Sequence, residues 1–585
     1  MKKISDIVID FLLSKNIKDV FTISGGGCIH LIDSLNKYQN TINTYCFHHE
    51  QALVMAAEGY YRQSNNLCAN IVTTGPGGTN TITGLLGMWL DSIPGIIISG
   101  QVSRSQLSKG TGCRQIGDQE FDIVKLVSSI TKYSVLINKP EDVLYELEKA
   151  YNICLDGRPG PVWIDIPLDI QGTVVDETSL KHFHHKNEYK NIEHDQISAL
   201  LELISLSNKP LVITGNGICL SNTSDRLLKF LDKFNLPVVT GPHSGVDCID
   251  NEYRHYMGRI GILGQLTSNT IVQESDLLIC LGSRLPVKMT GYNIKAFSPN
   301  SKKVIIDIDE NEINKHSFKI DLKIVRDLRT FFDTIDSIKI DNKYLKEKTE
   351  WINHIYKIRN DQIYSYPKHK NIKNYASFYE LINQATNVWN KESIVTSNGS
   401  AHVITLQTYQ LHSNQKLFTN VGCASMGYGL PASIGACIAN KKTSTICIEG
   451  DGSIMMNLQD LQTIKHYDLP ICIILINNDG YLSIKLTQES FFKGQEFASG
   501  PKNGVTLPKF KDMCQAFGIK YFSIKSNDEI ISCLTEAKSY HNPCMIEVFT
   551  HPKERHEPKV GHKGIDNNGN IIPGSLTDMY ISETF

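Results

Sequence analysis

Oxygen-bearing side chains stand at both ends of one short unit, EGDGSIMMNLQDLQTIKHYDLPICIILINND, residues 449–479. Asp451 lies in the turn GDGS, which follows the apolar run TSTICIEG, and Asn478 closes the next apolar run, PICIILINN. The carboxyl ends of neighbouring parallel strands meet at one edge of a sheet, where ligands bind. Oxygens of Asp451, Asn478 and the Gly480 carbonyl therefore predict a magnesium site with positions left for diphosphate oxygens and water.

A strand, a turn, a helix and a second strand must position these groups. The first strand is expected to end at Gly450, and the segment MNLQDLQTIKHY is expected to be a helix with four residues near one face: Leu458, Leu461, Gln462 and Ile464. The glycines let backbone N–H groups approach a phosphate at the helix start. A lone GDG would be only a polar turn, but the tandem of GDG, helix, apolar strand and NN is more specific.

A second acid, Glu50, opens the helix-like segment HHEQALVMAAEGYYRQ and precedes the strand and glycine turn CANIVTTGPGGTN. An acid in an apolar setting keeps its proton available, because desolvation disfavours the carboxylate. Such a group can serve general acid–base chemistry. The alternative is a first-turn glutamate that only complements the helix dipole.

Composition limits the class of protein. The chain has 585 residues, enough for three or four domains, and a formal net charge of −2, which does not favour nucleic acid or acidic membranes as partners. Its 15 cysteines occur singly, as expected of reduced thiols in a cytoplasmic protein. The first residues predict an amphipathic helix rather than a signal peptide, and no apolar run approaches the roughly 20 residues of a membrane span.

Strand-like and helix-like segments alternate almost throughout, which predicts the α/β class with parallel sheets. Two polar stretches, Asp176–Gln196 and Ile338–Asn374, are expected to be linkers. The predicted domains are residues 1–175, 190–340 and 370–555. Residues 556–585, rich in Gly, Pro and Asn, are expected to form an irregular tail or lid.

Nearly the whole chain resembles the thiamine-diphosphate enzymes of the acetolactate synthase group. The segments HHEQALVMAAEGYYR, TTGPGGTNTITGLLGMWLDSIPGIIISGQ and GRPGPVWIDIPLDIQ are similar to its pyrimidine-binding domain, and GCASMGYGLPASIGA is similar to the start of its diphosphate-binding domain. The resemblance implies three Rossmann-like parallel-sheet domains: pyrimidine-binding, central and diphosphate-binding. It also implies a cofactor between the first domain of one subunit and the third of another, hence a homodimer at least and commonly a homotetramer.

The resemblance gives roles to single positions. Glu50 would bind ring nitrogen N1′ of the cofactor, Met426 would fold the cofactor into a V shape, and the Ala424 carbonyl would accept from its 4′-amino group. Gln119 and Gly26 would lie near the reacting centre, although a surface residue and a flexible turn are the alternatives. The resemblance implies Asp451, Asn478 and Gly480 as Mg²⁺ ligands. The other implied cofactor contacts are Pro76, Asn80, Ser400, His402, Gly450, Gly452, Ser453, Tyr481 and Leu482.

The implied reaction is decarboxylation of a 2-oxo acid, with pyruvate expected, and transfer of the acyl carbanion to a second carbonyl. The chain departs from authentic acetolactate synthases at several positions. Those enzymes have a phenylalanine where this chain has Asp118, a tryptophan near the position of Thr487, and an arginine where this chain has Lys288. Ser400 and Ala401 stand in place of their Gln-His pair. The segments DGYLSIKLTQESFF, GSRL with TGYN, and PGSLTDMY together resemble the acetolactate synthase-like subgroup associated with surface-polysaccharide and deoxysugar pathways. Some members of that subgroup transfer an acetyl unit to a nucleotide-linked keto-sugar. The residues expected to line the substrate are His49, Asp118, Lys288, Ser483, Lys485, Thr487 and Gln488; for the last four, a solvated helix start is the alternative.

Several alternatives stay open. FAD could bind where ITGNGI, GRIGILG, GSRL and DIDENE stand in the middle domain, but glycine-rich strand ends occur in any Rossmann-like domain. A simple 2-oxo-acid decarboxylase is disfavoured because SKGTGCRQIGDQE lacks a His-His pair. A lyase or hydrolase on the same scaffold is a further candidate. A non-enzymatic subunit is disfavoured because Glu50, Asp451 and Asn478 are all present.

Overall fold

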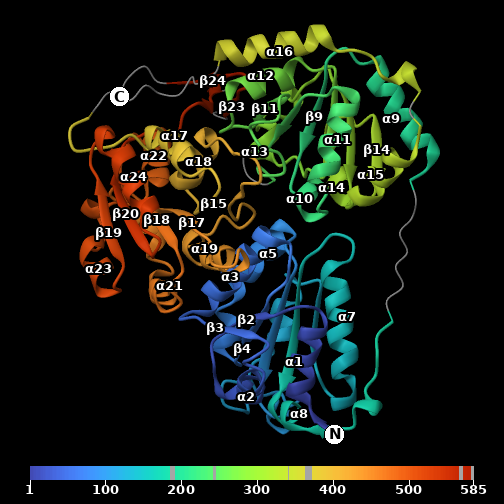
Figure 1. The fold of residues 1–585 in the computed structure, drawn as a ribbon, viewed down its shortest axis with the longest axis vertical. Helices are drawn as coiled ribbons and strands as arrows, with labels where there is room; N and C mark the ends of the chain where they lie inside the picture. Colours follow the sequence, from blue (N-terminus) through green and yellow to red (C-terminus); the bar gives the residue numbers. More distant parts are fainter. Residues whose placement is uncertain (185–191, 242–244, 340, 363–371, 566–570, 582–585) are drawn as a thin grey trace.

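Three α/β domains follow one another along the chain (Figure 1). The computed structural model describes residues 1–184, 192–241, 245–339, 341–362, 372–565 and 571–581. Each domain is built on a six-stranded parallel sheet. The strands are buried and nearly continuously apolar, as expected of parallel sheets, because helices cover both faces of such a sheet. The predicted fold class is therefore confirmed, whereas the predicted domain limits stay predictions.

The first domain has the strand order β3-β2-β4-β5-β7-β6. Its strands are β2 (Asp19–Thr22), β3 (Asn43–Cys46), β4 (Ala69–Val72), β5 (Gly95–Gln101), β6 (Tyr133–Leu136) and β7 (Pro161–Pro167). Its helices are α1 (Ile4–Ser14), α2 (Ile29–Lys37), α3 (Glu50–Ser64), α4 (Pro76–Thr79), α5 (Ile82–Asp91), α6 (Ile123–Val127), α7 (Val143–Leu155) and α8 (Leu168–Gly172). A separate antiparallel pair joins β1 (Lys2–Lys3) to β8 (Val174–Val175).

The middle domain has the order β11-β10-β9-β12-β13-β14. Its strands are β9 (Pro210–Thr214), β10 (Val238–Thr240), β11 (Tyr256–Arg259), β12 (Leu277–Leu281), β13 (Lys302–Asp307) and β14 (Leu322–Val325). Its helices are α9 (His194–Leu206), α10 (Gly217–Leu220), α11 (Ser224–Phe234), α12 (Leu266–Glu274), α13 (Val287–Thr290), α14 (Glu310–Asn314), α15 (Leu328–Ser337) and α16 (Thr349–Gln362). Numbered within the domain, this order is 3-2-1-4-5-6, that of dinucleotide-binding sheets.

The third domain has the order β16-β15-β17-β18-β20-β19, which repeats the order of the first domain, 2-1-3-4-6-5. Its strands are β15 (Ser393–Thr396), β16 (Leu417–Phe418), β17 (Thr445–Gly450), β18 (Ile471–Asn477), β19 (Lys520–Ile524) and β20 (Cys544–Phe549). Its helices are α17 (Phe378–Val388), α18 (Ser400–Thr408), α19 (Gly429–Ala439), α20 (Asp451–Ile454), α21 (Leu461–His466), α22 (Leu482–Phe491), α23 (Phe510–Ala516) and α24 (Ile530–Ser539).

The first and third domains pack together through α3 and α19, which lie side by side in Figure 1. Two glycines allow their backbones to touch. A Cβ on Gly59 would lie 2.1 Å from the Ala432 carbonyl oxygen, and one on Gly435 would lie 1.7 Å from that of Ala56. Only glycine fits at such an approach, so this crossing fixes the two domains relative to each other.

The second predicted linker is wrong in part, because residues 349–362 form α16. Trp351 and Ile355 are buried in the core of the middle domain, and the Trp351 indole donates to the Pro210 carbonyl at 3.0 Å. The dense charges of this stretch hid a short apolar stripe. In the first predicted linker, α9 begins at His194. Residues 185–191, 340 and 363–371 of these stretches lie outside the described residues.

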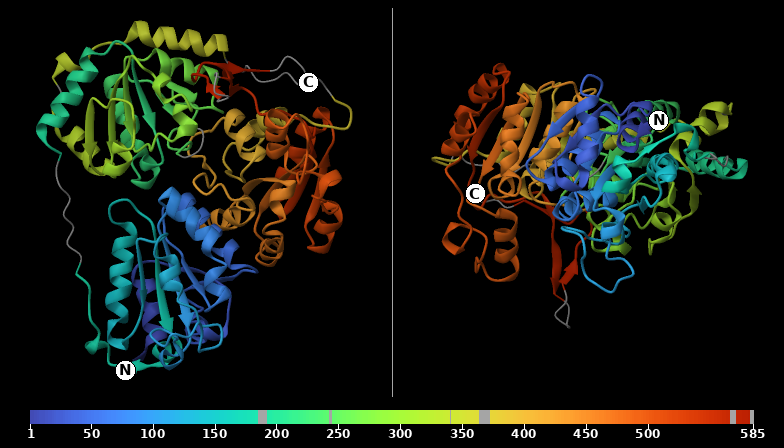
Figure 2. Two further views of the ribbon diagram at one scale, coloured as in Figure 1. Left: turned by 180° about the vertical axis from the view of Figure 1, so that it is seen from behind. Right: turned by 90° about the horizontal axis from the view of Figure 1, so that it is seen from below.

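The prediction of an irregular tail is also wrong in part. Strand β21 (Lys559–Val560) pairs with β24 (Met579–Tyr580), and β22 (His562–Ile565) pairs with β23 (Ile571–Pro573) in a hairpin that projects from the molecule in Figure 2. Leu576 is buried in the core of the middle domain, and Asn269 donates to its carbonyl at 2.9 Å. Residues 566–570 and 582–585 lie outside the described residues.

The helix predicted over residues 456–467 is shorter and divided. It consists of a 3₁₀ turn, Leu458–Asp460, followed by α21. The reason lies at Asn457, whose buried side chain donates to the Gly427 carbonyl at 2.8 Å and whose backbone is not helical, with φ −138°. Among the described residues, no helix combines the length and the apolar character that crossing a bilayer requires.

Candidate active site

Asp451 lies where β17 and β18, which pair in parallel, reach their carboxyl ends. Its carboxylate is 1% exposed and accepts three backbone N–H groups: Gly452 at 2.7 Å, Asn478 at 3.0 Å and Gly480 at 2.9 Å. Burial raises the pKa of Asp451 to about 6, although the three N–H groups and the charge of Lys485 act in the opposite direction. The turn after β17 and the turn after β18 therefore share one carboxylate.

The donor set beside Asp451 fits a divalent cation. The Asn478 Oδ1 atom is buried and has no hydrogen-bond partner among the described residues. Buried amide oxygens are normally satisfied, so an unsatisfied one next to a buried carboxylate marks a place for a ligand. Gly480 has φ +114°, and a Cβ there would lie 2.6 Å from the Ser499 carbonyl oxygen. Carboxylate, amide and carbonyl oxygens are the ligands that Mg²⁺ takes.

The residues around this cradle form a tight frame. A Cβ on Gly452 would lie 2.4 Å from the Tyr481 ring, and Leu482, the next residue, is buried at the start of α22. Ser453 accepts from the Gly427 N–H at 2.8 Å, and its hydroxyl lies 2.7 Å from that of Ser397. Gly450 is the N-cap of α20. The predicted phosphate-side residues therefore lie together around one helix start.

Lys485 reaches the cradle from α22. Its side chain is 8% exposed, and its Nζ donates to the Asp479 carbonyl at 2.7 Å and to that of Asn478 at 3.4 Å. Thr487 donates to the Ser483 carbonyl within the same helix at 2.9 Å. Gln488 donates to the Phe497 carbonyl at 2.8 Å and accepts from the Ser499 hydroxyl. Of these residues, Lys485 is the one that contacts the cradle.

Ser400 opens α18 and brings three segments together. Its hydroxyl lies 3.4 Å from that of Ser483 and 2.8 Å from Nε2 of His556, a residue that the sequence did not single out. Burial, followed by the charges of Lys288 and His556, lowers the pKa of His402 to about 3. Burial and Lys559 lower that of His556 to about 4, so both imidazoles are neutral near pH 7.

Glu50 is the first residue of α3 and is 9% exposed. Asn80 donates to its Oε2 at 3.0 Å, so the turn after β4 fixes the carboxyl group. His49 caps the helix, because its Nδ1 accepts from the Gln51 N–H at 3.1 Å. Pro76, the first residue of α4, is exposed.

Gln119 lies on an exposed loop with φ +60°, a left-handed conformation that is uncommon for any residue but glycine. Its carbonyl accepts from the Thr74 hydroxyl at 3.2 Å. Asp118 and Gly26 are exposed, and a Cβ on Gly26 would meet no atom within 4 Å. Lys288 is exposed on α13 of the middle domain.

Family models for thiamine pyrophosphate enzymes match all three domains. The N-terminal TPP binding domain matches residues 2–126, the central domain residues 197–335 and the C-terminal TPP binding domain residues 397–548. The acetolactate synthase large subunit of Buchnera aphidicola is 30% identical over 90% of each chain. The acetolactate synthase isozyme 2 large subunit of Escherichia coli is 30% identical over 94% of this chain and 96% of its own. The acetolactate synthase large subunit of Haemophilus influenzae is 29% identical over 100% of this chain and 99% of its own.

This chain belongs to the thiamine pyrophosphate enzymes. The predicted family is therefore confirmed, and thiamine diphosphate is its cofactor. The donor set around Asp451 and Asn478 agrees with a cofactor that carries a diphosphate, because Mg²⁺ is commonly bound through one or two protein ligands together with phosphate oxygens.

Within one chain of this thiamine pyrophosphate enzyme, the segments that carry Glu50 and Asp451 touch, but the two acids themselves are not joined by a hydrogen bond between described residues. The start of α3 contacts the turn after α20: Gln51 donates to Asn457 at 3.2 Å and the His48 N–H to Asp460 at 3.3 Å. Among the described residues, no hydrogen bond or ion pair joins Glu50 to Asp451. The half-buried Met426 and exposed Ala424 belong to a loop that contacts the first domain elsewhere, near Asp91.

Proposed function

We propose that this enzyme is an acetolactate synthase-like carboligase, which decarboxylates pyruvate or a similar 2-oxo acid and transfers the acyl unit to a second carbonyl. The observation that carries the proposal is the cradle of Asp451, Asn478 and Gly480, with its unsatisfied amide oxygen, in a chain 30% identical to acetolactate synthase large subunits over nearly its whole length. That cradle supports an enzyme that binds a diphosphate and its cation, and argues against an inactive relative.

Bound thiamine diphosphate supplies the carbon nucleophile and the electron sink for decarboxylation. Asp451, Asn478 and the Gly480 carbonyl would hold Mg²⁺, while the start of α20 with Ser453 would hold phosphate oxygens. The Glu50 carboxyl would hold a proton at the pyrimidine ring nitrogen, oriented by Asn80. The Ala424 carbonyl would accept from the amino group on the same ring.

A second copy of the chain would complete the site. In the part of the chain that the structure describes, no hydrogen bond or ion pair joins Glu50 or Gln119 of the first domain to Asp451 or Met426, although both sets carry ligand-binding chemistry. A homodimer in which the first domain of one subunit faces the third domain of its partner would join them, and a homotetramer would contain two such pairs. Light scattering of the purified protein tests the stoichiometry.

We propose a polar acceptor, with a nucleotide-linked keto-sugar of a surface-polysaccharide or deoxysugar pathway as the leading candidate. Asp118 stands where the resembled group has a phenylalanine, Thr487 lies near the position of its tryptophan, and both are exposed. Lys288 is exposed and Lys485 lies at the cradle, so cations are available for a phosphorylated acceptor.

We also propose a nucleotide-binding site in the middle domain, with FAD as the ligand to test. A cavity of about 230 Å³ lies beyond the carboxyl ends of β9 and β12, lined by Gly215, Asn216, Gly282, Arg158 and Arg284. Ligand pockets commonly measure about 300–1,000 Å³, so FAD would require the Arg158 pairs with Asp309 and Glu312 to open. The visible absorbance of protein reconstituted with FAD tests this.

The deciding experiment incubates pure protein with Mg²⁺, thiamine diphosphate, pyruvate labelled at C1 or C2, and a panel of keto acids and nucleotide-linked keto-sugars. We expect labelled CO₂ and acceptor-dependent transfer of the C2 label. Free acetaldehyde without transfer would identify a simple decarboxylase, and no CO₂ release with any 2-oxo acid would reject the proposal.

Glu50→Gln is the matched test of the proposed acid. The amide keeps the shape and the contact with Asn80, so the fold and cofactor affinity should stay near those of the wild type. Exchange of the thiazolium C2 proton should slow at least about 100-fold, since general acid–base groups contribute roughly 10²–10⁴-fold. NMR of quenched samples measures the exchange, and a wild-type rate would remove Glu50 from the mechanism.

A further inference from the structure

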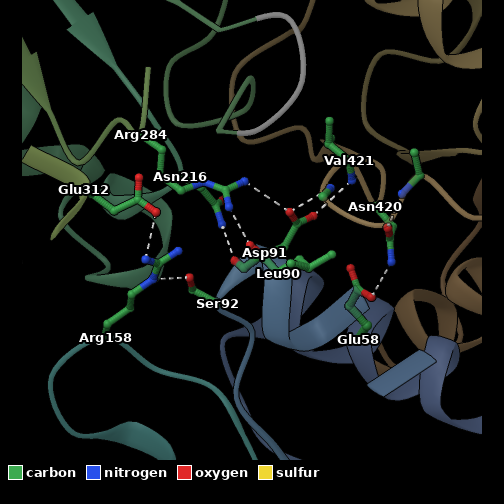
Figure 3. A network of polar contacts seen from close by, with 12 residues as sticks. Glu58, Leu90, Asp91, Ser92, Arg158, Asn216, Arg284, Glu312, Asn420 and Val421 are labelled. Atoms are coloured by element: carbon green, nitrogen blue, oxygen red, sulfur yellow. Dashed lines mark hydrogen bonds and ion pairs between the residues drawn. The ribbon is translucent and has the colours of Figure 1, made fainter. Parts of the chain in front are cut away.

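The loop of residues 420–428, between β16 and α19, has no regular secondary structure, and two of its members, Gly422 and Ala424, are exposed. A loop of this kind would be free to move if it were held only by its own backbone. Instead, two buried carboxylates of the first domain hold it, as Figure 3 shows from close by.

Asp91, the last residue of α5, holds the beginning of the loop. Its buried carboxylate accepts the Val421 N–H at 3.0 Å and the Gly422 N–H at 2.9 Å. The Arg62 guanidinium donates to the same carboxylate at 2.6 Å, which balances its charge. Arg284 of the middle domain donates to the Leu90 carbonyl at 2.6 Å, so all three domains meet at the end of α5 (Figure 3).

Asn420 holds the next part of the loop. Its side chain is fully buried, donates to Glu58 Oε2 at 3.0 Å and accepts the Ala424 N–H at 3.1 Å. Glu58 accepts from Arg62 Nε at 2.9 Å and from the Tyr428 hydroxyl at 3.2 Å. Each end of the Asn420 amide therefore has one partner, and the orientation of the amide is set by Glu58.

Ala424 has φ +52°, in the left-handed region. A residue with a Cβ pays a conformational cost there and stays only where its surroundings require it. The hydrogen bond from its N–H to Asn420 holds the peptide before Ala424, and Asn398 donates to the carbonyl of the following residue, Ser425, at 3.0 Å. If the hydrogen bond to Asn420 were lost, the peptide would relax to negative φ and the direction of the Ala424 carbonyl would change.

We propose that Asn420, oriented by Glu58, is a positioning residue that keeps Ala424 left-handed and so directs its carbonyl toward the cofactor's amino group. The inference rests on the proposed function, which places that carbonyl at the cofactor. It goes further because it gives a role to a buried residue that contacts neither cofactor nor substrate. Asn420 is thus a determinant of proton transfer at the cofactor and not of diphosphate affinity.

The test uses full-length holoenzyme and two readouts: the C2 proton exchange rate of bound thiamine diphosphate by NMR, and its dissociation constant by calorimetry with Mg²⁺. Asn420→Ala should slow exchange at least about tenfold and change the dissociation constant less than about threefold. Adding Ala424→Gly should restore most of the rate, because glycine adopts positive φ without cost. A purely structural role for Asn420 would not be rescued at this exposed position.

Asn269→Ala is the matched control. Asn269 is equally buried and uses the same two ends of its amide, accepting from the Gly261 N–H at 2.8 Å and donating to the Leu576 carbonyl at 2.9 Å, but it lies in the middle domain. It should lose stability and keep the exchange rate. If Asn420→Ala does not fold, Ala424→Val tests the same point at the exposed position, because a β-branched residue strongly disfavours positive φ.

The outcomes separate the two proposals. Absence of cofactor binding by the wild type would reject the proposed function. Wild-type binding and exchange with an unchanged rate in Asn420→Ala, or with no recovery in the double variant, would overturn the positioning role alone.

Discussion

Two loops of the molecule contain a left-handed residue and are backed by a buried amide that binds a buried carboxylate. In the first domain, Gln119 has φ +60°, and in the third, Ala424 has φ +52°. Behind each lies a buried amide: Gln101 donates to the Phe121 carbonyl at 2.9 Å, and Asn420 accepts from Ala424 at 3.1 Å. Each amide in turn donates to a buried carboxylate at 3.0 Å, Asp165 in the first case and Glu58 in the second.

The two carboxylates differ in charge compensation. Glu58 is paired with Arg62. Asp165 accepts from Ser99 and Gln101, and in the part of the chain that the structure describes no basic side chain forms an ion pair with it. Burial therefore raises the pKa of Asp165 to about 7. Burial raises the pKa of Glu58 as well, but there the charge of Arg62 opposes the rise, whereas Asp165 has only neutral donors against it. The environment of each acid therefore decides how far its pKa rises.

The largest expected effect is on cofactor binding, and it distinguishes the role of Asp451 in the third domain from that of Glu50 in the first. Asp451→Ala removes the carboxylate to which three backbone N–H groups donate. Loss of a residue that only supports a metal ligand typically costs roughly 10–100-fold in metal affinity. Loss of a ligand itself should therefore weaken Mg²⁺-dependent binding of thiamine diphosphate by at least about 100-fold. Calorimetry with and without a chelator measures it. Binding at wild-type strength would mean that the cation is held elsewhere, whereas Glu50→Gln should leave binding intact.

A smaller effect is expected from Gln101→Met, which removes the amide behind the Gln119 loop and leaves Asp165 and the Phe121 carbonyl each short of a partner. We expect a loss of about 1–3 kcal/mol in the free energy of unfolding, measured with urea. The turnover number should fall while thiamine diphosphate affinity does not change. Unchanged turnover would show that the Gln119 loop needs no such support and that the two loops are not equivalent.

Asp165→Asn exchanges a single atom of the side chain and tests the pH dependence of Asp165 directly. Because the folded pKa lies above the unfolded value of about 3.9, the folded state binds the extra proton between about pH 4 and pH 7, and this group's contribution to stability falls as pH rises through that range. Asparagine mimics the protonated acid, so the variant should gain stability over the wild type as pH rises from 5 to 7. Urea unfolding at both values measures the difference, and parallel curves would contradict it.

The sequence predicted those features that depend on short local patterns. The acid at the start of α3 and the oxygen cradle at the ends of β17 and β18 follow from short motifs on neighbouring strands, which parallel pairing brings to one edge. Helix α16 was missed because Trp351 and Ile355 stand among charged residues that dominate its composition. Contacts such as Asn420 with Glu58 join distant segments of two domains, and no pattern in a single segment encodes them.

The close approach of α3 and α19 has a consequence for synthesis of the chain. Gly59 and Gly435, where the two backbones touch, are separated by most of the polypeptide. At the usual elongation rates of about 5–20 residues per second, the ribosome needs roughly 20–75 seconds to produce the second helix after the first. During that interval the face of α3 that packs on α19 has no partner from the third domain, so the first domain exposes this apolar contact surface while the rest of the chain is made.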